Sequence, residues 1–425
     1  MIKKSGQRNS AGLQAAAECE PALQNSSRRK TPPHSLFPIV GIGASAGGFE
    51  AITQLLEHLP ADTGMAFVVV QHLDPTHESA LSELLSRATK MPAAQARNNS
   101  IVEPNRIYVI PPNKLMKLQA RRLKISPRKD GKVDRMPVDY FLRSLAEDEN
   151  ERAIGVIMSG NGSDGTLGLL AVKSAGGITF AQAEKSAKFP SMPASAIAAG
   201  CVDCVLTPEK MADELKHMGR RLMDLPLSQP EVEPDQASHE KAYGDILAFL
   251  RQKMAVDFTH YKHATLRRRI ERRMRLHKLE SLKEYRDYLA KNAGEVKELF
   301  NDILIHVTGF FRDGFVFQTL KNRILPRLLR GLSQEQTIRV WVPGCSTGEE
   351  VYSLAIVLME LMDGKKWHRT VQIFGTDIDD TALEKARAGI YSGNIQSEIS
   401  PARLRRFFTR LDGGFRVNKN LREMC

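Results

Sequence analysis

One stretch of the sequence, residues 38–52, constrains the fold more than any other. An apolar run breaks into glycines around a single serine and then resumes with helical spacing, which predicts a strand, a tight turn and a helix. Residues 43–47 fit G-x-S-x-G, in which small neighbours allow a strained turn to present the Ser45 hydroxyl at a helix N-terminus. Residues 41–46 also fit the dinucleotide pattern G-x-G-x-x-A. The stretch therefore predicts either a nucleophilic serine or a phosphate-binding turn.

The next strands place polar side chains where they could meet Ser45. The apolar run 66–71 predicts a strand, and a dinucleotide site would need an acidic side chain at its end to hold the ribose hydroxyls. His72 follows instead, which disfavours a nucleotide-dependent oxidoreductase. A third apolar run, 153–158, leads into a glycine-rich loop that contains Asp164. Because parallel strands end at one edge of a sheet, a nucleophile, a base and an orienting carboxylate are predicted in the order Ser45, His72, Asp164.

Five short motifs occur together along residues 36–220: Gly43–Gly48, Gln71–His72, Ile110–Pro112, Ser159–Gly165 and Phe189–Pro193. As a set they resemble the catalytic domain of the bacterial chemotaxis protein-glutamate methylesterases. The resemblance implies Ser45 as nucleophile, His72 as general base and Asp164 as its orienting partner. The implied substrates are methyl-esterified glutamates, and glutamine amides, of chemoreceptors. The esterase is expected to need no cofactor and no metal.

Two further positions follow from the same resemblance. Asn161 stands where the family commonly has Met, at a position that helps to form the oxyanion pocket partly through its backbone N–H. This departure is expected to affect rate more than reaction type. Met192 and Pro193 lie in a loop that is near the substrate in the family, so both are additional candidates for the site.

Composition limits the class of protein. The 425 residues are 42% hydrophobic, enough for two to four domains, and no apolar run approaches the roughly 20 residues of a transmembrane helix. We therefore expect a cytoplasmic protein that does not insert into a membrane. Cys201 and Cys204 form a lone C-x-x-C, which favours buried small residues at a strand edge over a metal or thiol site. The oligomeric state is left open.

The pattern of a strand, a glycine turn and a helix occurs a second time from residue 338. The strand predicted over residues 371–376 is followed by an acidic residue. Asp377 stands where a carboxylate would bind ribose hydroxyls. Residues 246–425 resemble the chemotaxis receptor glutamate methyltransferases through Leu266–Ile270, Val307–Asp313, Cys345–Ser353, Thr376–Asp379 and Ala388–Tyr391. The resemblance implies that S-adenosylmethionine contacts Thr308, Arg312, Glu350 and Asp377. Because His306 replaces the family's usual Asn, one cofactor contact is in question.

The formal net charge of +12 could indicate a nucleic-acid partner or an acidic protein partner. A strong cluster of positive charge lies in residues 262–275, where apolar residues at helical spacing predict an amphipathic helix with a basic outer surface. By the resemblance this helix would face the acidic methylation helices of a chemoreceptor, and no nucleic-acid partner is expected.

The predicted organisation has five parts. Residues 1–35 form a disordered tail, too short for the receiver domain that usually precedes the esterase, and residues 36–220 form the esterase, an α/β doubly wound and mostly parallel sheet. A linker over 221–240 leads to a small helical bundle over 241–305. Residues 306–425 are expected to be an incomplete Rossmann-like methyltransferase domain, truncated inside a strand pair at residues 405–417, with impaired cofactor binding. The alternative is a scaffold that recruits receptor-modifying enzymes without catalysis in its C-terminal half.

Overall fold

The structure is a computed structural model that describes residues 37–71, 81–128, 136–223, 236–304, 308–333, 336–365 and 369–425. The predicted tail, His72 and His306 lie outside the described residues. Among the helices that the structure describes, none has the length and apolar character needed to span a bilayer.

A seven-stranded sheet forms the centre of the first domain, in the order β10-β9-β8-β1-β2-β5-β3. Each neighbouring pair is parallel, which confirms the predicted doubly wound sheet. The central strands are buried along their whole length, as expected when helices cover both faces. The strands are β1 (Ile39–Ala44), β2 (Ala66–Gln71), β3 (Ala93–Gln95), β5 (Ile107–Val109), β8 (Ala153–Ile157), β9 (Ile178–Gln182) and β10 (Cys204–Leu206).

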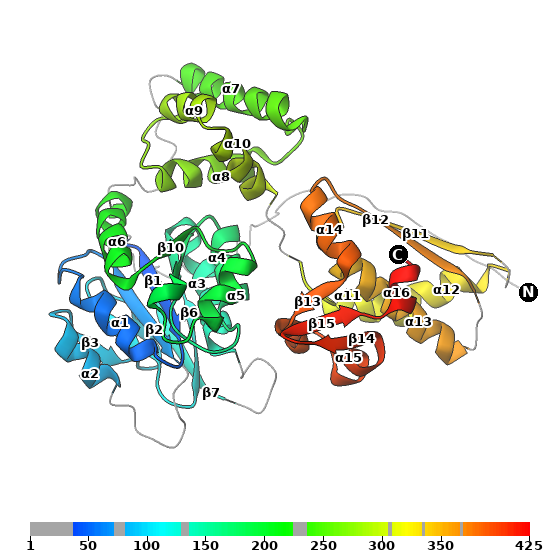
Figure 1. Cartoon of the computed structure of the whole chain (residues 1–425), viewed down its shortest axis with the longest axis horizontal. Coiled ribbons are helices and arrows are strands. Elements are labelled where there is room, and N and C mark those ends of the chain that lie inside the picture. Colours follow the sequence, from blue (N-terminus) through cyan, green and yellow to red (C-terminus); the bar gives the residue numbers. More distant parts are fainter. Residues whose placement is uncertain are drawn as a thin grey trace, which may run out of the picture. The chain divides into compact units, whose positions relative to one another are not determined.

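Two sets of helices cover the two faces of this sheet (Figure 1). One core combines the sheet with α1 (Gly48–Glu57), α2 (Leu81–Ala88) and α6 (Pro208–Met223). The other core combines it with α3 (Pro137–Glu149), α4 (Thr166–Ser174) and α5 (Ser191–Ala198). The loop predicted over residues 189–193 therefore runs into the first turn of α5, because Ser191 begins that helix.

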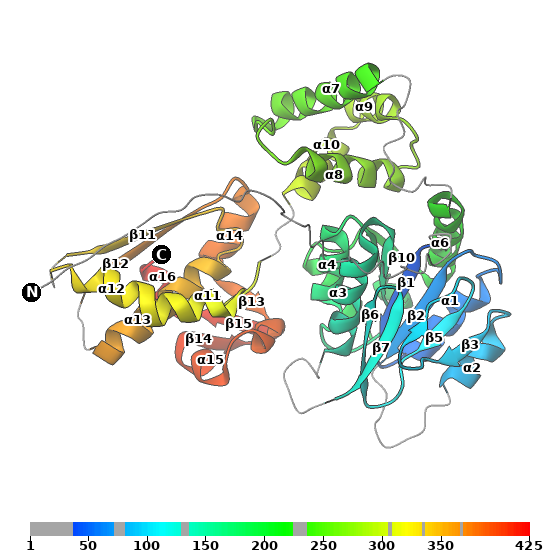
Figure 2. The same ribbon diagram turned by 180° about the vertical axis from the view of Figure 1, so that it is seen from behind.

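A small antiparallel sheet packs beside α3 (Figure 2). Its strands are β4 (Ser100–Ile101), β6 (Lys114–Gln119) and β7 (Arg122–Pro127). The strands β6 and β7 form a hairpin. Its turn is Ala120–Arg121, both with positive φ, where Asp148 of α3 accepts their backbone N–H groups.

The second region is helical, as predicted, with α7 (Gln236–Met254), α8 (His263–Leu276), α9 (Leu282–Lys291) and α10 (Ala293–Ile303) around one apolar core. The linker predicted over 221–240 is wrong at both ends, because α6 continues to Met223 and α7 begins at Gln236. The predicted basic surface of α8 also needs correction. Arg272 pairs with Asp302 and Arg273 with Glu295, both of α10, because buried charges need partners.

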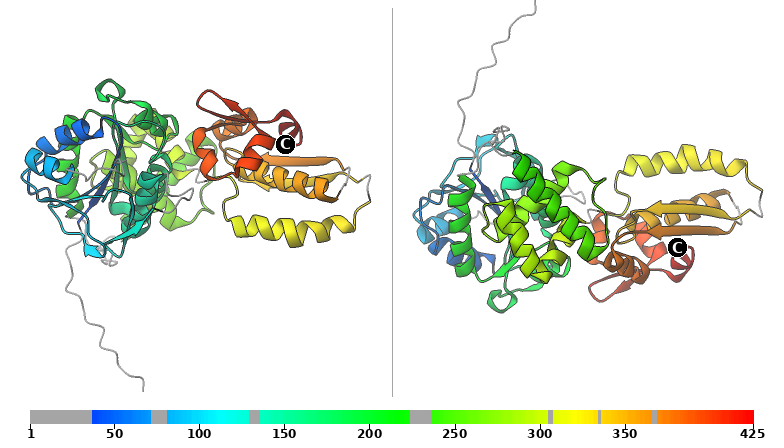
Figure 3. Two further views of the ribbon diagram at one scale, coloured as in Figure 1. Left: turned by 90° about the horizontal axis from the view of Figure 1, so that it is seen from below. Right: turned by 90° about the horizontal axis from the view of Figure 1, so that it is seen from above.

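The last region has a two-stranded parallel sheet, β11 (Ile338–Pro343) and β12 (Val371–Thr376), with the long α13 (Glu349–Lys365) packed against it (Figure 3). The other elements are α11 (Gly314–Thr319), a π-helical segment (Leu320–Ile324), α12 (Leu325–Arg330), α14 (Asp380–Ala388), β13 (Ile390–Ser392), a 3₁₀ segment (Gly393–Ser397), α15 (Pro401–Phe407), β14 (Phe408–Leu411), β15 (Gly414–Val417) and α16 (Lys419–Glu423). In the strand pair predicted over residues 405–417, the first strand begins later than predicted. Residues 405–407 belong to α15, which starts at Pro401 and is capped by the Ser400 side chain.

Burial alternates along β11 and β12, so one face of this sheet is covered and the other is open. On the open face the Trp341 side chain is 69% exposed and Phe374 is 52% exposed. This differs from the first domain, whose central strands are covered on both faces.

Candidate active site

Ser45 follows the last residue of β1, in the turn that leads to α1. Its backbone N–H donates to the Ser159 carbonyl at 3.0 Å, and its own carbonyl accepts the Gly48 N–H at 2.9 Å. Gly47 caps the helix with φ of 69°, a left-handed conformation that favours glycine. The predicted strand, tight turn and helix are therefore confirmed, with a partly buried Ser45 at the carboxyl edge of the sheet.

The glycines of β1 make room for α3. A Cβ on Gly41 would come within 2.7 Å of Leu142 Cδ2 and 2.9 Å of Phe141 Cε1. A Cβ on Gly43 would collide with the Val138 side chain. Packing by α3 thus accounts for the G-x-G spacing without any phosphate, which removes the support that the glycines gave to a dinucleotide site.

The loop after β8 packs directly against Ser45. A Cβ on Gly160 would lie 2.6 Å from the Met192 Sδ and 2.9 Å from the Ser45 Cβ, so the Gly160 backbone lies between these two side chains. Met192 is fully buried, and its N–H donates to the Gly160 carbonyl at 2.9 Å. Asn161, the next residue, is exposed. The structure thus brings Met192 close to Ser45 and places Asn161 at the solvent side of the same loop.

Ser159 and Gln182 hold this loop in place, and the sequence analysis singled out neither. The Ser159 hydroxyl donates to the Ala46 carbonyl at 2.9 Å and accepts the Phe189 N–H at 3.0 Å. The Gln182 side chain accepts the Ser159 N–H at 2.9 Å. These polar groups tie the Ser45 turn to two other loops. A polar residue at the end of a buried strand, as at Gln182, was the available signal.

Asp164 is buried at the N-terminus of α3. Its carboxylate accepts the Val138 N–H at 3.0 Å and the Asp139 N–H at 2.9 Å, one on each oxygen. The Val138 side chain reaches from this helix end toward Gly43 of β1 and Gly165 beside Asp164. Asp164 therefore lies in the loop that faces the carboxyl end of β1.

His72, the third member of the predicted triad, lies outside the described residues. Its neighbour Gln71 is paired with Ala44 in the sheet, and the Gln71 amide donates to the Ser45 carbonyl at 3.3 Å. Gln71, the residue before His72 in the sequence, therefore lies beside Ser45.

Cys201 and Cys204 are free thiols, as are Cys345 and Cys425. Cys201 is fully buried, and burial raises the pKa of its thiol to about 12. Within the ranges that the structure describes, no group of His, Cys, Asp and Glu side chains has the arrangement of a metal site.

In the last region, Asp377 follows β12 and closes the turn after β11. Its carboxylate accepts the Ser346 N–H at 2.7 Å and the Asp379 N–H at 2.9 Å. Gly344 has φ of 67°, and a Cβ added there would meet open space. Glu350 is exposed in the first turn of α13. Asp377 thus lies beside the Gly344 turn, where a nucleoside site would place a carboxylate.

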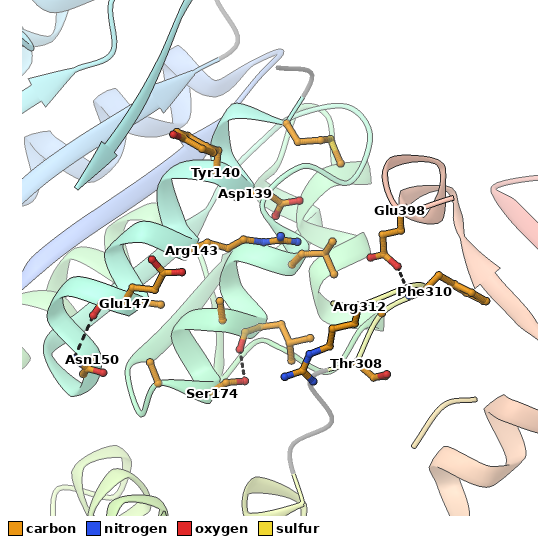
Figure 4. Close-up of a pocket in the computed structure, with 17 residues that line it drawn as sticks. Asp139, Tyr140, Arg143, Glu147, Asn150, Ser174, Thr308, Phe310, Arg312 and Glu398 are labelled. Atoms are coloured by element: carbon orange, nitrogen blue, oxygen red, sulfur yellow. Dashed lines mark hydrogen bonds between the residues drawn. The ribbon is translucent and has the colours of Figure 1, made fainter. Parts of the chain in front are cut away.

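Thr308 and Arg312 flank a short segment that Glu398 holds (Figure 4). The Glu398 carboxylate accepts the Phe310 N–H at 2.7 Å, and burial raises its pKa. The Phe310 ring packs against Tyr391 and Phe408 in the apolar core of this region. The sequence analysis did not identify Glu398, because nothing local links it to a segment about ninety residues earlier.

Comparisons with known proteins give the following matches. Residues 40–215 match the model of the CheB methylesterase family, residues 241–304 the all-alpha domain of CheR methyltransferase, and residues 306–425 its SAM-binding domain. A 104.1 kDa protein of Rhodobacter capsulatus is 34% identical over 361 residues, which cover 81% of this chain and 38% of the relative.

A protein-glutamate methylesterase/protein-glutamine glutaminase of Burkholderia thailandensis is 35% identical over 202 residues, covering 47% of this chain and 59% of the relative. The CheB methylesterase catalytic domain of Thermotoga maritima is 30% identical, with a TM-score of 0.41, and the match covers 43% of this chain and 99% of that structure. The chain spans between 38% and 59% of the length of the two curated relatives named here.

Proposed function

This chain belongs to two families in succession, CheB methylesterase over residues 40–215 and CheR methyltransferase over 241–304 and 306–425, and from this premise we propose that it modifies chemoreceptors by hydrolysing glutamate methyl esters. The proposed nucleophile is Ser45. The observation that carries the proposal is the position of Ser45 on a glycine turn at the carboxyl end of β1, packed against Gly160 and near the buried Met192.

The proposed reaction follows the order of a serine hydrolase. The Ser45 hydroxyl attacks the ester carbonyl carbon while His72 takes its proton, and that proton then leaves with the methoxide as methanol. Water attacks the acyl-enzyme by the same route and releases the glutamate. Asp164 orients His72, and backbone N–H groups at the Ser45 turn and at Asn161 stabilise the oxyanion. Met192 forms part of the substrate pocket.

The same steps would convert a glutamine amide into glutamate, with ammonia as the leaving group in place of methanol. A Burkholderia relative carries both activities in its name, which supports this extension. The proposed partner is a methyl-accepting chemoreceptor, met on its cytoplasmic side.

Ser45→Ala tests the proposed nucleophile. We expect methanol release from a methylated receptor fragment to fall by at least about a thousandfold, because no other step replaces the covalent intermediate. Ser86→Ala, an exposed serine on α2, is the matched control and should leave the rate unchanged. Retention of most activity in Ser45→Ala would refute the assignment.

For residues 306–425 we propose a methyltransferase module that uses S-adenosylmethionine, with Asp377 toward the ribose and with Glu350, Thr308 and Arg312 as further contacts. The cofactor supplies the methyl group for a glutamate carboxylate. The carboxylate beside the Gly344 turn fits such a ligand, whereas the open face of β11 and β12 supports weak binding. We therefore propose that this half binds the cofactor weakly.

A further inference from the structure

The N-termini of α3 and α4 meet. At each of them an acidic side chain accepts backbone N–H groups from the first turn of the other helix. Asp164, just before α4, accepts the N–H groups of Val138 and Asp139 in the first turn of α3. Asp139 in turn accepts the Gly168 N–H in the first turn of α4 at 2.7 Å. Exposed N–H groups and helix dipoles favour carboxyl groups at both places. The two helix ends are thus capped reciprocally.

The contact between the helices is close. A Cβ on Gly168 would lie 2.6 Å from the Leu142 Cβ and 3.2 Å from the Asp139 Cα. Because of this close packing, the Asp139 backbone lies directly against the start of α4, to which its carboxyl group is also hydrogen-bonded. The loop that carries Asp164 ends at that same point, so its position depends on the contact made by Asp139.

Asp139 is 4% exposed and shares its surroundings with three other titratable groups in the described residues. Asp164 lies beside it, Arg143 lies one turn along α3 on the same side (Figure 4), and Cys201 lies nearby as an uncharged thiol. Burial, and then the Asp164 carboxylate, raise the pKa of Asp139 to about 7. Asp139 therefore keeps its proton up to about neutral pH.

We propose that Asp139 is a positioning residue of the esterase: its carboxyl group, bound across the first turn of α4, holds the Asp164 loop in the place from which Asp164 orients the catalytic base. This inference rests on the proposed function of Asp164. It assigns Asp139 no contact with the substrate.

The test is the kinetics of methanol release by the full chain carrying Asp139→Asn or Asp139→Ala. The Asn side chain still accepts the Gly168 N–H and resembles the protonated acid, so kcat at pH 6 should stay within about threefold of the original. The Ala side chain cannot accept this hydrogen bond. We expect its kcat to fall at least about tenfold with KM unchanged, because the base loses orientation and the substrate pocket does not change.

Two controls separate this inference from the proposed function. Asp213→Ala, an exposed acid on α6, should behave like the original chain. Full activity in Ser45→Ala would overturn the esterase assignment itself. If Ser45→Ala is inactive while Asp139→Ala keeps its kcat, only the positioning role is wrong. A rise in KM with unchanged kcat in Asp139→Ala would also contradict it.

The pH dependence gives a second measurement, which does not require Asp139→Ala to fold. Below pH 6 the original acid is protonated and matches Asn, so the ratio of kcat/KM for Asp139→Asn to the original should be near one. Above pH 8 the second buried charge repels Asp164 in the original chain only, and the ratio should rise at least about threefold. A constant ratio between about pH 5.5 and 8.5 would overturn the claim that ionisation of Asp139 disturbs the Asp164 loop, while the kcat of Asp139→Ala tests the positioning role itself.

Discussion

At the scale of single residues, the buried Asp139 makes the stability of the first domain depend on pH. Burial, and then the neighbouring Asp164 carboxylate, oppose ionisation of Asp139, so the folded protein holds a proton that the unfolded chain has released. The pKa of this carboxyl group is about 4 in the unfolded chain and about 7 in the folded protein. The folded state therefore loses stability progressively as the pH rises through the range between these two pKa values. Above that range the loss is complete.

Asp139→Asn should remove this loss of stability. Relative to the original chain, the variant should gain on the order of 3 kcal/mol between pH 5 and pH 8, at 1.4 kcal/mol per unit of pKa. Thermal unfolding followed at both pH values measures the difference, and Asp213→Asn serves as the exposed control. A difference in Tm that does not change with pH would show that Asp139 does not titrate near neutrality.

At the scale of elements, the contact between β1 and α3 positions the site. Val138, Phe141 and Leu142 of α3 occupy the space that side chains at Gly41 and Gly43 would need. The same helix end supplies the N–H groups that bind Asp164. The position of α3 against β1 therefore places both the Ser45 strand and the Asp164 loop.

Gly41→Ala should destabilise this contact by about 1–3 kcal/mol, because the new methyl group overpacks against three side chains of α3. The free energy of opening measured by hydrogen exchange at β1 amides should fall by that amount. Gly294→Ala is the control, since a Cβ there meets nothing within 4 Å, and it should change stability by less than about 1 kcal/mol. An unchanged exchange rate at β1 in Gly41→Ala would contradict this packing argument.

At the scale of the whole molecule, the two parallel sheets differ in coverage. The sheet of the first domain has apolar cores on both faces, whereas β11 and β12 leave Trp341 and Phe374 exposed on one face. A nucleoside site at the carboxyl edge of a sheet depends on walls from several strands and helices. Within the residues that the structure describes, two strands supply that edge.

We therefore expect weak binding of S-adenosylmethionine, with a Kd above about 10 µM in calorimetric titration of the chain as given. Asp377→Ala should weaken it further, because the ribose loses its carboxylate partner. Asp412→Ala, an exposed turn residue, should have no effect. A low-micromolar Kd for the unchanged chain would contradict the expectation of an impaired half.

Much of the fold could be predicted locally. Apolar runs of five or six residues indicated β1, β2, β8, β11 and β12, and helical spacing indicated the bundle. The errors lie at element ends, at 221–240 and 405–407, where polar composition or aromatic residues were weighed above helix caps. Ser45 was predicted because it follows a strand directly, and Asp164 because it lies in the glycine-rich loop after another strand. The roles of Ser159, Gln182 and Glu398 depend on partners distant in sequence.

Local pattern was thus enough to establish which chemical groups stand at the ends of the strands, since a run of side chains and the turn that stops it are neighbours along the chain. Local pattern could not establish why positions 41 and 43 require glycine, or that Asp139 lies beside Asp164. Those facts arise when α3 packs across β1 and against α4, and the hydrogen bonds involved join residues 25 to 29 positions apart. Close packing in three dimensions, which no single segment encodes, brings these groups together.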